Sequence, residues 1–357
     1  MIIHNLKIAF RSLLKYKTQN IISIIGLAVG LVCFAFSALW IRYEMSYDNF
    51  HSNADRIYRV NTSIYKWDTE ETGASEIVQR GMPYPMTSWL KSNFPEIEDA
   101  TGIFTIGGGS SSDFSILFLD YSFSNIFDLN LSEDFFIHGR TNRPTALAPE
   151  LVNEEVSQFI QERTNWDVRA TLPRWQPNTN IRFNVASPLT SRFRNNNEFL
   201  NDWSSRGFDI FILLHDNVDL QAFEQKIDKI LIPELWSNHV SLVLTPLTQL
   251  RYKDPTGNIQ SVVKYAHIQI FAIAGLLVIL SSLFNHLTLY VTRLRSRLRE
   301  LALRKVNGAT DLQIAATLFS DFFLVILLSL VFGFMLMTWF LPAFTKYASI
   351  ENTNINI

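Results

Sequence analysis

A charge-dense segment between two apolar stretches carries the residue types best suited to chemistry in this chain. Residues 293–310 read RLRSRLRELALRKVNGAT, with arginine at alternate positions from 293 to 299. An apolar run at 267–289 precedes the segment, and another at 314–341 follows it. A short basic segment between two membrane spans is retained on the cytoplasmic side. The segment is therefore either a surface that a cytoplasmic partner could bind or only an orientation signal.

The sequence shows none of the motifs that would give the chain an enzymatic activity. It lacks the Gly-x-x-x-x-Gly-Lys-Ser/Thr loop, so the chain itself does not hold ATP phosphates. It also lacks His-Glu-x-x-His and the Gly-x-Ser-x-Gly elbow. Five histidines show no metal-ligand spacing: His51, His138, His215, His239 and His267. We predict that the chain is not an enzyme and carries no metal or cofactor.

Three stretches are long and apolar enough to cross a membrane: 21–41, 268–291 and 314–341. The first two hold no Asp, Glu, Lys or Arg, and the third holds only Asp321. A hydrocarbon core about 30 Å thick requires roughly 20 apolar helical residues. Buried helices of a large soluble protein are the alternative, but such helices normally keep a polar stripe.

The basic residues predict the orientation. Lys7, Arg11, Lys15 and Lys17 precede the first stretch with no acidic residue among them, and the 293–310 segment is also basic. Both flanks are therefore predicted to be cytoplasmic. Residues 44–266 hold 19 Lys and Arg against 29 Asp and Glu, and they are predicted to lie outside.

A cleaved signal peptide is the other interpretation of the N-terminus, but its apolar core would be about 7–15 residues, shorter than the run here. The only cysteine, Cys33, lies in the first stretch, so the outer domain folds without disulfides. Residues 1–19 have the pattern of an amphipathic helix lying in the membrane interface, or of a basic cap with no further role. Gly26 and Gly30 would permit close packing of the first span against another helix.

The outer region mixes strand-like and helix-like patterns, which indicates an α+β fold. Strands are predicted at 56–61, 114–119 and 208–214, and helices at 84–93, 150–163 and 220–230. Asp219 is the predicted N-cap of the last helix. Residues 107–112 and 140–149 are predicted to be loops.

Two polar residues stand out inside the predicted spans, namely Asn285 and Asp321, with His286 beside the first. Polar groups in a membrane are costly and often functional. We expect them near the inner ends of their spans, making hydrogen bonds between helices or at the interface. A proton relay, which needs a chain of such groups, is the less favoured alternative.

Several segments together resemble the FtsX/MacB-like permeases of bacterial ABC transporters. RELALRKVNGA at 299–309 is similar to that family's cytoplasmic signature, and NLKIAFRSLLK at 5–15 with GLAVG at 26–30 resembles its N-terminal helix and first span. YDNFHSNADRIYRV at 47–60 is similar to the start of its periplasmic core domain in the form common in Bacteroidetes. FPEIE at 94–98 and FSNIFD at 123–128 resemble later parts of that domain.

The resemblance implies an α-helical membrane protein with three transmembrane helices and an α+β extracytoplasmic domain inserted between the first and second. The expected parts are an interfacial helix 1–19, a first span 20–43, a periplasmic core domain 44–266, a second span 267–291, a coupling segment 292–313, a third span 314–341 and an outer loop 342–357. It places the chain in the bacterial inner membrane with its N-terminus in the cytoplasm.

The resemblance also implies partners. A separate cytoplasmic subunit would bind ATP and dock on nine residues of the coupling segment: Arg299, Glu300, Leu301, Leu303, Arg304, Lys305, Val306, Gly308 and Ala309. Glu300 and Arg304 are spaced to pair on one helix face, and Gly308 can end that helix. A second permease copy or half, a periplasmic adaptor and membrane lipid are the other implied partners.

The family's half-unit has four spans, whereas this chain stops after the third, so we expect a part of a longer permease. The leading prediction is a transporter subunit that couples ATP hydrolysis to export or to mechanical transmission. The alternatives are a non-transporting sensor or regulatory subunit and a non-functional fragment. The substrate does not follow from the sequence.

Overall fold

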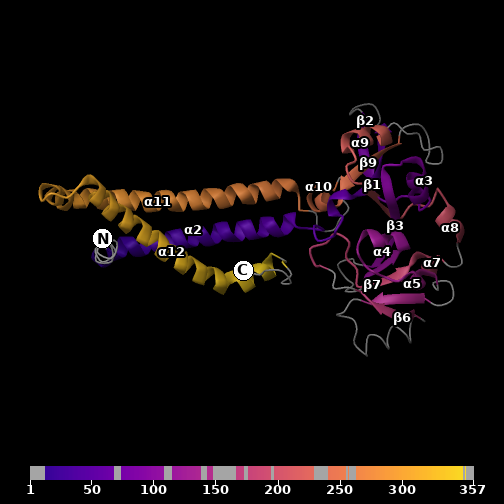
Figure 1. Ribbon diagram of the computed structural model, residues 1–357, viewed down its shortest axis with the longest axis horizontal. Helices are drawn as coiled ribbons and strands as arrows, with labels where there is room; N and C mark the ends of the chain where they lie inside the picture. Colours follow the sequence, from indigo (N-terminus) through magenta and orange to yellow (C-terminus); the bar gives the residue numbers. More distant parts are fainter. Residues whose placement is uncertain are drawn as a thin grey trace. The chain divides into compact units, whose positions relative to one another are not determined.

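The structure is a computed structural model that describes residues 13–67, 74–107, 115–137, 143–147, 166–172, 176–193, 197–228, 240–254, 256, 263–348 and 350. The chain divides into two compact units (Figure 1). One comprises residues 1–43 and 265–357, and the other comprises residues 44–264. The predicted outer domain was 44–266.

Three long helices form the first unit: α2 (Lys17–Met45, whose last two residues belong to the second unit), α11 (Tyr265–Val306) and α12 (Asp311–Tyr347). Each is long and apolar enough to cross a membrane, as the sequence predicted. Only 22, 11 and 17% of their respective apolar windows is buried within the protein. The exposed apolar side chains therefore need lipid around them rather than water.

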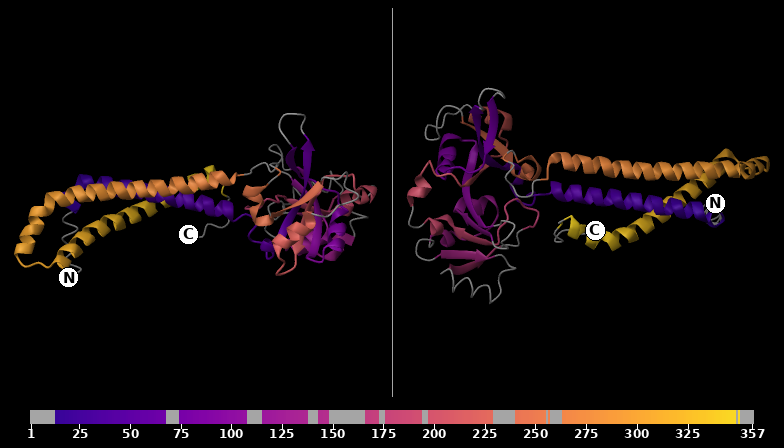
Figure 2. Two further views of the ribbon diagram at one scale, coloured as in Figure 1. Left: turned by 90° about the horizontal axis from the view of Figure 1, so that it is seen from above. Right: turned by 180° about the vertical axis from the view of Figure 1, so that it is seen from behind.

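The helix α11 is longer than its predicted span, which ended at residue 291. Its 42 residues extend about 63 Å, roughly twice the thickness of a hydrocarbon core. The basic segment is thus mostly a helical extension of the second span, and only residues 307–310 form the turn to α12 (Figure 2). The physical reason is composition, because Arg, Leu, Ala, Lys and Glu are all strong helix formers.

The predicted outer loop at 342–357 is also helical in its first part, because α12 continues through Pro342 to Tyr347. At the other end of the chain, α2 begins at Lys17, and most of the predicted interfacial helix 1–19 lies outside the described residues.

Small residues set the contacts between these helices. A Cβ atom added at Gly30 would lie 2.6 Å from Ser282 Cβ, and one added at Gly26 would lie 3.7 Å from Asn285 Nδ2. A Cβ at Gly333 of α12 would approach Ala28 at 3.6 Å from its Cα. The first helix therefore meets α11 through the face that carries Gly26 and Gly30, as close packing in lipid requires.

The second unit is built on a nine-stranded sheet with the order β2-β1-β8-β3-β4-β7-β5-β6, with β9 also paired to β1 (Figure 1). The strands are β1 (Ile57–Trp67), β2 (Ala74–Gln79), β3 (Ile97–Gly107), β4 (Ser115–Leu119), β5 (Arg143–Leu147), β6 (Trp166–Thr171), β7 (Val185–Pro188), β8 (Asp209–Leu214) and β9 (Val240–Pro246). The pairs β4–β7 and β5–β6 are parallel and the others antiparallel. This mixed sheet with separate helices agrees with the predicted α+β class.

Both faces of the central strand β8 are buried. Its residues Ile210, Ile212 and Leu214 belong to one apolar core, and Phe211 and Leu213 belong to another. The period of two sends alternate side chains to opposite faces. The first core includes residues of α3 (Met86–Asn93) and α9 (Leu220–Asp228), and the second includes residues of α4 (Tyr121–Ile126) and α5 (Glu133–Ile137). The remaining short helices are α7 (Leu189–Arg192), α8 (Asn197–Asn201), α10 (Leu250–Lys253) and the 3₁₀ turns Ala54–Arg56 and Leu247–Gln249.

The three predicted strands correspond to β1, β4 and β8, and the helices predicted at 84–93 and 220–230 correspond to α3 and α9. Asp219 accepts a hydrogen bond from the Ala222 amide at 3.2 Å, which confirms the predicted cap. The helix predicted at 150–163 and most of the 107–112 loop lie outside the described residues. The loop predicted at 140–149 was wrong at 143–147, because β5 forms there, with Thr145 and Ala146 buried. Pro144 does not prevent the strand, because proline is tolerated where a strand begins.

Candidate functional site

The coupling segment forms the end of α11 and the turn that follows it. Glu300 accepts a hydrogen bond from Arg304 Nη2 at 2.9 Å, one helical turn away. Glu300 also lies 3.6 Å from Arg297 Nε, and Lys305 Nζ reaches Asp311 at 2.7 Å across the turn. The Lys305–Asp311 pair is exposed and the Glu300–Arg304 pair is partly exposed, whereas Arg297 is largely buried. Exposed pairs orient side chains more than they stabilise the fold.

A defined pair of caps fixes the turn. Gly308 has a φ of +90°, the left-handed conformation that favours glycine at the end of a helix. The amides of Gly308 and Ala309 donate to the carbonyls of Lys305 and Arg304, both at 3.1 Å. This is the Schellman arrangement. Thr310 and Gln313 then form a capping box that starts α12. The prediction that Gly308 ends the helix is confirmed.

Apolar side chains project from this end of the hairpin. Leu303 is 59% exposed, Val306 84% and Leu312 79%. Arg299 and Lys305 are exposed between them, whereas Leu301 and Ala309 are partly buried. The segment thus presents an apolar surface surrounded by basic groups, which is an unusual surface to leave in water.

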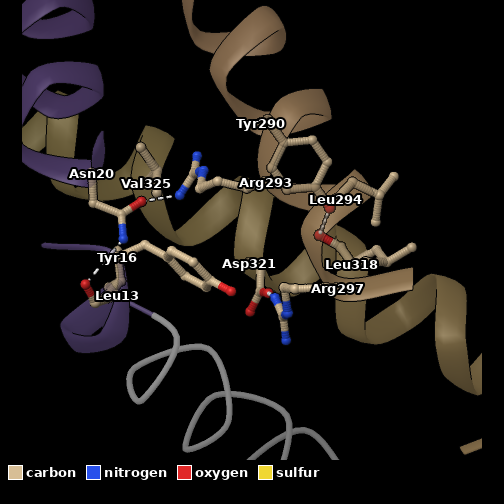
Figure 3. Close-up of a pocket in the computed structure, with 10 residues that line it drawn as sticks. All are labelled: Leu13, Tyr16, Asn20, Tyr290, Arg293, Leu294, Arg297, Leu318, Asp321 and Val325. Atoms are coloured by element: carbon tan, nitrogen blue, oxygen red, sulfur yellow. Dashed lines mark hydrogen bonds and ion pairs between the residues drawn. The ribbon is translucent and has the colours of Figure 1, made fainter. Parts of the chain in front are cut away.

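A second group of polar residues lies further from the turn, and its members share one face of α11. The positions 286, 290, 293, 297, 300 and 304 are spaced by three and four residues and form one stripe. Along this stripe, Arg297 forms an ion pair with Asp321 of α12. Arg293 donates a hydrogen bond to Asn20 of α2, and Tyr290 donates to the Leu318 carbonyl at 2.8 Å. Polar side chains therefore join all three helices (Figure 3).

These bonds surround a pocket that residues of the three helices line (Figure 3). Its polar lining consists of Tyr16, Asn20, Tyr290, Arg293, Arg297 and Asp321. The sequence singled out Asp321, and the structure shows it bonded between helices rather than in a chain of carboxylates. The pattern did not reveal the part played by Asn20, Arg293 and Arg297. The three-and-four spacing along 286–304 was the signal that could have done so.

The other two polar residues singled out in the spans, Asn285 and His286, form no ion pair between the described helices. Asn285 is exposed and lies beside Gly26. His286 is buried, with its ring 4.8 Å from that of Phe322, and neither ring nitrogen has a hydrogen-bond partner among the described residues. Within the described part of the chain, no group of three or more His, Cys, Asp or Glu residues is placed to hold a metal ion.

The outer unit contains buried carboxylates, among them those of Asp48 and Glu44, that side chains of the same unit bind. Asp48 accepts hydrogen bonds from Thr179 Oγ1 at 2.5 Å and Asn180 Nδ2 at 2.6 Å. Burial raises the pKa of Asp48 to about 6. Three residues later, burial lowers the pKa of His51 to about 4. At the end of α2, Glu44 accepts from Arg251 Nε at 2.7 Å, and both side chains are buried.

The long apolar helices, their polar contacts and the capped basic turn make up the candidate membrane region of the chain. Residues 272–357 match the family model described as FtsX-like permease C-terminal, which confirms the FtsX-like resemblance over those residues. This part of the chain is thus similar to the C-terminal part of FtsX-like permeases. No curated protein matches the chain.

Two solved structures are similar to part of the chain. One is a domain described as that of a permease protein from Porphyromonas gingivalis, at 14% identity and a TM-score of 0.41, covering 55% of this chain and 91% of that one. The other is the periplasmic region of MacB from Actinobacillus actinomycetemcomitans, at 11% identity and a TM-score of 0.32, covering 53% of this chain and 89% of that one. Both TM-scores are too low for either likeness to establish a common fold.

Proposed function

We propose that this chain is the membrane subunit of an ABC transporter and that a separate cytoplasmic ATP-binding subunit docks on the end of the α11–α12 hairpin. The family match supports the permease class. The docking site is supported by one observation above the others, the exposed apolar side chains of Leu303, Val306 and Leu312. Buried in an interface, such side chains would each contribute about 1.5–3 kcal/mol.

The charges around this surface indicate the chemistry of the partner. Arg299 and Lys305 are exposed and basic, so the docking surface of the partner should be acidic around an apolar centre. The caps at Gly308 and Thr310 hold the turn in one conformation, so little conformational entropy is lost when the partner binds. A prearranged hairpin end is what a docking element requires.

Continuous helices provide the route by which motion would travel. α11 is one helix from Tyr265 to Val306, so a displacement at its C-terminal end moves the whole helix. α2 enters the outer unit at Glu44, which Arg251 holds in a buried ion pair. Truncating one partner of such a pair leaves the other charge buried and unpaired, which costs about 3–5 kcal/mol. The helix end would therefore transmit force to the domain rather than slip.

The orientation that this mechanism needs follows from the charges. The basic residues around 293–310 favour a cytoplasmic hairpin end and a cytoplasmic N-terminus. The acidic 44–264 unit would then lie in the periplasm, where its motion would drive export or transmit a mechanical signal. A second permease copy would complete the assembly, so that two ATP-binding subunits can close on each other.

Charge variants of the hairpin end test the docking proposal. The unaltered chain is co-expressed with candidate cytoplasmic ATP-binding subunits from the same genome, and complex formation and ATPase rate are measured. Val306→Asp and Arg299→Glu are each expected to reduce complex formation by about tenfold or more, the factor for 1.4 kcal/mol. Arg295→Glu, one turn before Arg299 on the same exposed helix surface, is the matched control and should have a smaller effect.

The ion pair of the segment needs a separate pair of variants. Glu300→Arg and Arg304→Glu each place like charges one turn apart, whereas the double variant restores a pair with reversed polarity. If the partner contacts these charges directly, complex formation by the double variant remains reduced. If the charges matter only for helix stability, complex formation by the double variant recovers. Unchanged binding in Val306→Asp, Arg299→Glu and both single variants would refute the docking surface. Stimulated ATPase activity without any export in liposomes would instead support the sensor alternative.

A further inference from the structure

The polar pocket between α2, α11 and α12 contains two buried atoms without a partner. Arg293 is 9% exposed, and its Nη2 atom has no hydrogen-bond partner among the described residues. Asp321 is 8% exposed, and its Oδ1 atom likewise has none there. Both residues line the pocket, and Figure 3 shows their side chains around it. Buried polar atoms of native proteins are nearly always paired, so these two require an explanation.

The neighbouring groups are already engaged. Arg297 forms its ion pair with the other oxygen of Asp321. Asn20 accepts from Arg293 Nη1 and donates to the Leu13 carbonyl at 3.0 Å. Arg293 Nε donates to the Leu289 carbonyl at 3.3 Å, along its own helix. The pocket therefore offers one free donor from a guanidinium and one free acceptor from a carboxylate.

Arg293 has no carboxylate partner among the described residues. Asp321 of the pocket and Glu300 of α11 both form ion pairs with Arg297. The described partners of Arg293, Asn20 and the Leu289 carbonyl, are neutral, so Arg293 is a buried cation without a paired anion. A buried charge without a counter-ion is costly, and a bound anion would remove that cost.

The position of the pocket along the helices identifies the source of the anion. Arg293 comes two residues after the end of the apolar stretch 268–291, and Asn20 comes directly before the stretch 21–41. Both residues therefore lie at the edge of the hydrocarbon layer, where lipid phosphates are found. Basic pockets between membrane helices at this level bind phospholipid headgroups.

We propose that this pocket binds the headgroup of an anionic glycerophospholipid. A phosphodiester oxygen accepts a hydrogen bond from Arg293 Nη2, and a hydroxyl of the headgroup donates to Asp321 Oδ1. Phosphatidylglycerol supplies both groups and one negative charge that pairs with Arg293. The site is separate from the hairpin end, and it does not depend on the docking of an ATP-binding subunit.

The test compares lipids on the purified full chain in phosphatidylcholine nanodiscs. Phosphatidylglycerol is added, and lipid retention is measured by native mass spectrometry together with the thermal unfolding midpoint. We expect phosphatidylglycerol to be retained on the order of tenfold better than phosphatidylcholine, as for one charge-assisted hydrogen bond. Arg293→Gln should abolish that preference. Arg295→Gln, which removes an exposed arginine two residues away, should leave it unchanged.

Other outcomes would overturn the proposal that the pocket binds a lipid headgroup. Equal retention by the unaltered chain and the Arg293→Gln variant would overturn the proposal, as would an equal loss in Arg295→Gln. If inorganic phosphate raises the unfolding midpoint through Arg293 while phosphatidylglycerol does not, the site binds free phosphate and the lipid assignment is wrong. Should Arg293→Gln fail to fold, the unaltered chain still decides, because a midpoint that phosphatidylglycerol does not raise above phosphatidylcholine refutes the lipid site.

Discussion

Buried carboxylates are held differently in the outer unit and in the membrane helices. Asp120 of the outer unit accepts hydrogen bonds from Thr101 Oγ1 at 2.6 Å, Phe123 N at 2.9 Å, Tyr84 Oη at 3.0 Å and Gly102 N at 3.4 Å. Asp321 of the helices has one ion-pair partner, Arg297, and one oxygen without any partner among the described residues. Asp120 thus has partners for both oxygens within its own unit, whereas Asp321 keeps one oxygen without a partner among the described residues.

This difference follows from the surroundings of each unit. Loops and strand ends of the outer unit offer backbone amides, and Asp120 uses two of them, one as the N-cap of α4. A membrane helix has no free amides in its interior, so Asp321 depends on side chains of other helices or on a ligand. The unpaired oxygen of Asp321 is therefore the place where a ligand would complete the network.

The largest expected effect is that of Asp120→Ala, because four donors, two of them in β3, lose their acceptor together. Burial and the neighbouring Asp120 raise the pKa of Tyr84, so its phenol remains a donor and is also left unpaired. We expect a loss of about 3–4 kcal/mol in the unfolding free energy of the outer unit. Denaturant unfolding followed by tryptophan fluorescence measures it. Asp202→Ala, which removes an exposed carboxylate, should leave the midpoint unchanged, and an equal loss there would contradict the assignment.

Next in size is the pH dependence at Asp48 and His51, whose pKa values shift in opposite directions. The raised pKa of Asp48 makes the folded state bind a proton more tightly, so its contribution falls as pH rises from about 4 to about 6. The lowered pKa of His51 makes the folded state release a proton, so its contribution falls as pH drops from 6.5 to about 4. Each amounts to about 3 kcal/mol, and together they nearly cancel.

Single variants separate the two contributions. Asp48→Asn, which tolerates the positive φ of 57° at this position, should leave a stability that decreases as pH falls from 6.5 to 4. His51→Gln should leave one that increases over the same range. Hydrogen exchange of residues 46–51, corrected for the intrinsic rate, reports the local opening free energy. Slopes of the same sign in both variants would refute the opposed linkage.

The contact of α2 with α11 gives a smaller and diagnostic effect. Gly30→Ala places a Cβ atom 2.6 Å from Ser282 Cβ, and such overpacking typically costs about 1–3 kcal/mol. Gly26→Ala meets its nearest atom at 3.7 Å and should be neutral or slightly stabilising, since alanine is the better helix former. Thermal unfolding in detergent distinguishes the two, and an equal response would show that α2 does not pack on α11 through Gly30.

The smallest expected effect is that of Glu300→Gln on stability. Its ion pair with Arg304 is partly exposed, at 42 and 34% of the two side chains, so the unfolding free energy should change by less than about 1 kcal/mol. The same variant should weaken docking of an ATP-binding subunit if the segment acts as proposed. A large loss of stability would instead mean that Glu300 belongs to the buried network of Arg293 and Arg297.

The spans could be predicted from the sequence because a membrane imposes a length and a composition on each helix. Strands β1, β4 and β8 were also predictable, since their β-branched and aromatic residues form compact runs. Strand β5, which lies between β7 and β6, was not, because proline is typical of turns and the pairing partner β7 lies about 40 residues further along the chain. The pocket was not predictable for a related reason, since Asn20 and Arg293 are 273 residues apart. Only the polar stripe along 286–304 could be recognised from the sequence, because it lies within a single helix.

The spacing of Arg293 and Arg297 has a consequence for motion. The two arginines are one helical turn apart on α11, a rise of about 5–6 Å. If α11 slides by one turn toward its C-terminal end, Arg293 replaces Arg297 beside Asp321, and the interhelical charge pair is conserved. A rotation about the helix axis would instead carry both arginines away from α12. We therefore expect α11 to behave as a two-position ratchet, which spin labels on α11 and α12 would detect as two distance populations in place of one.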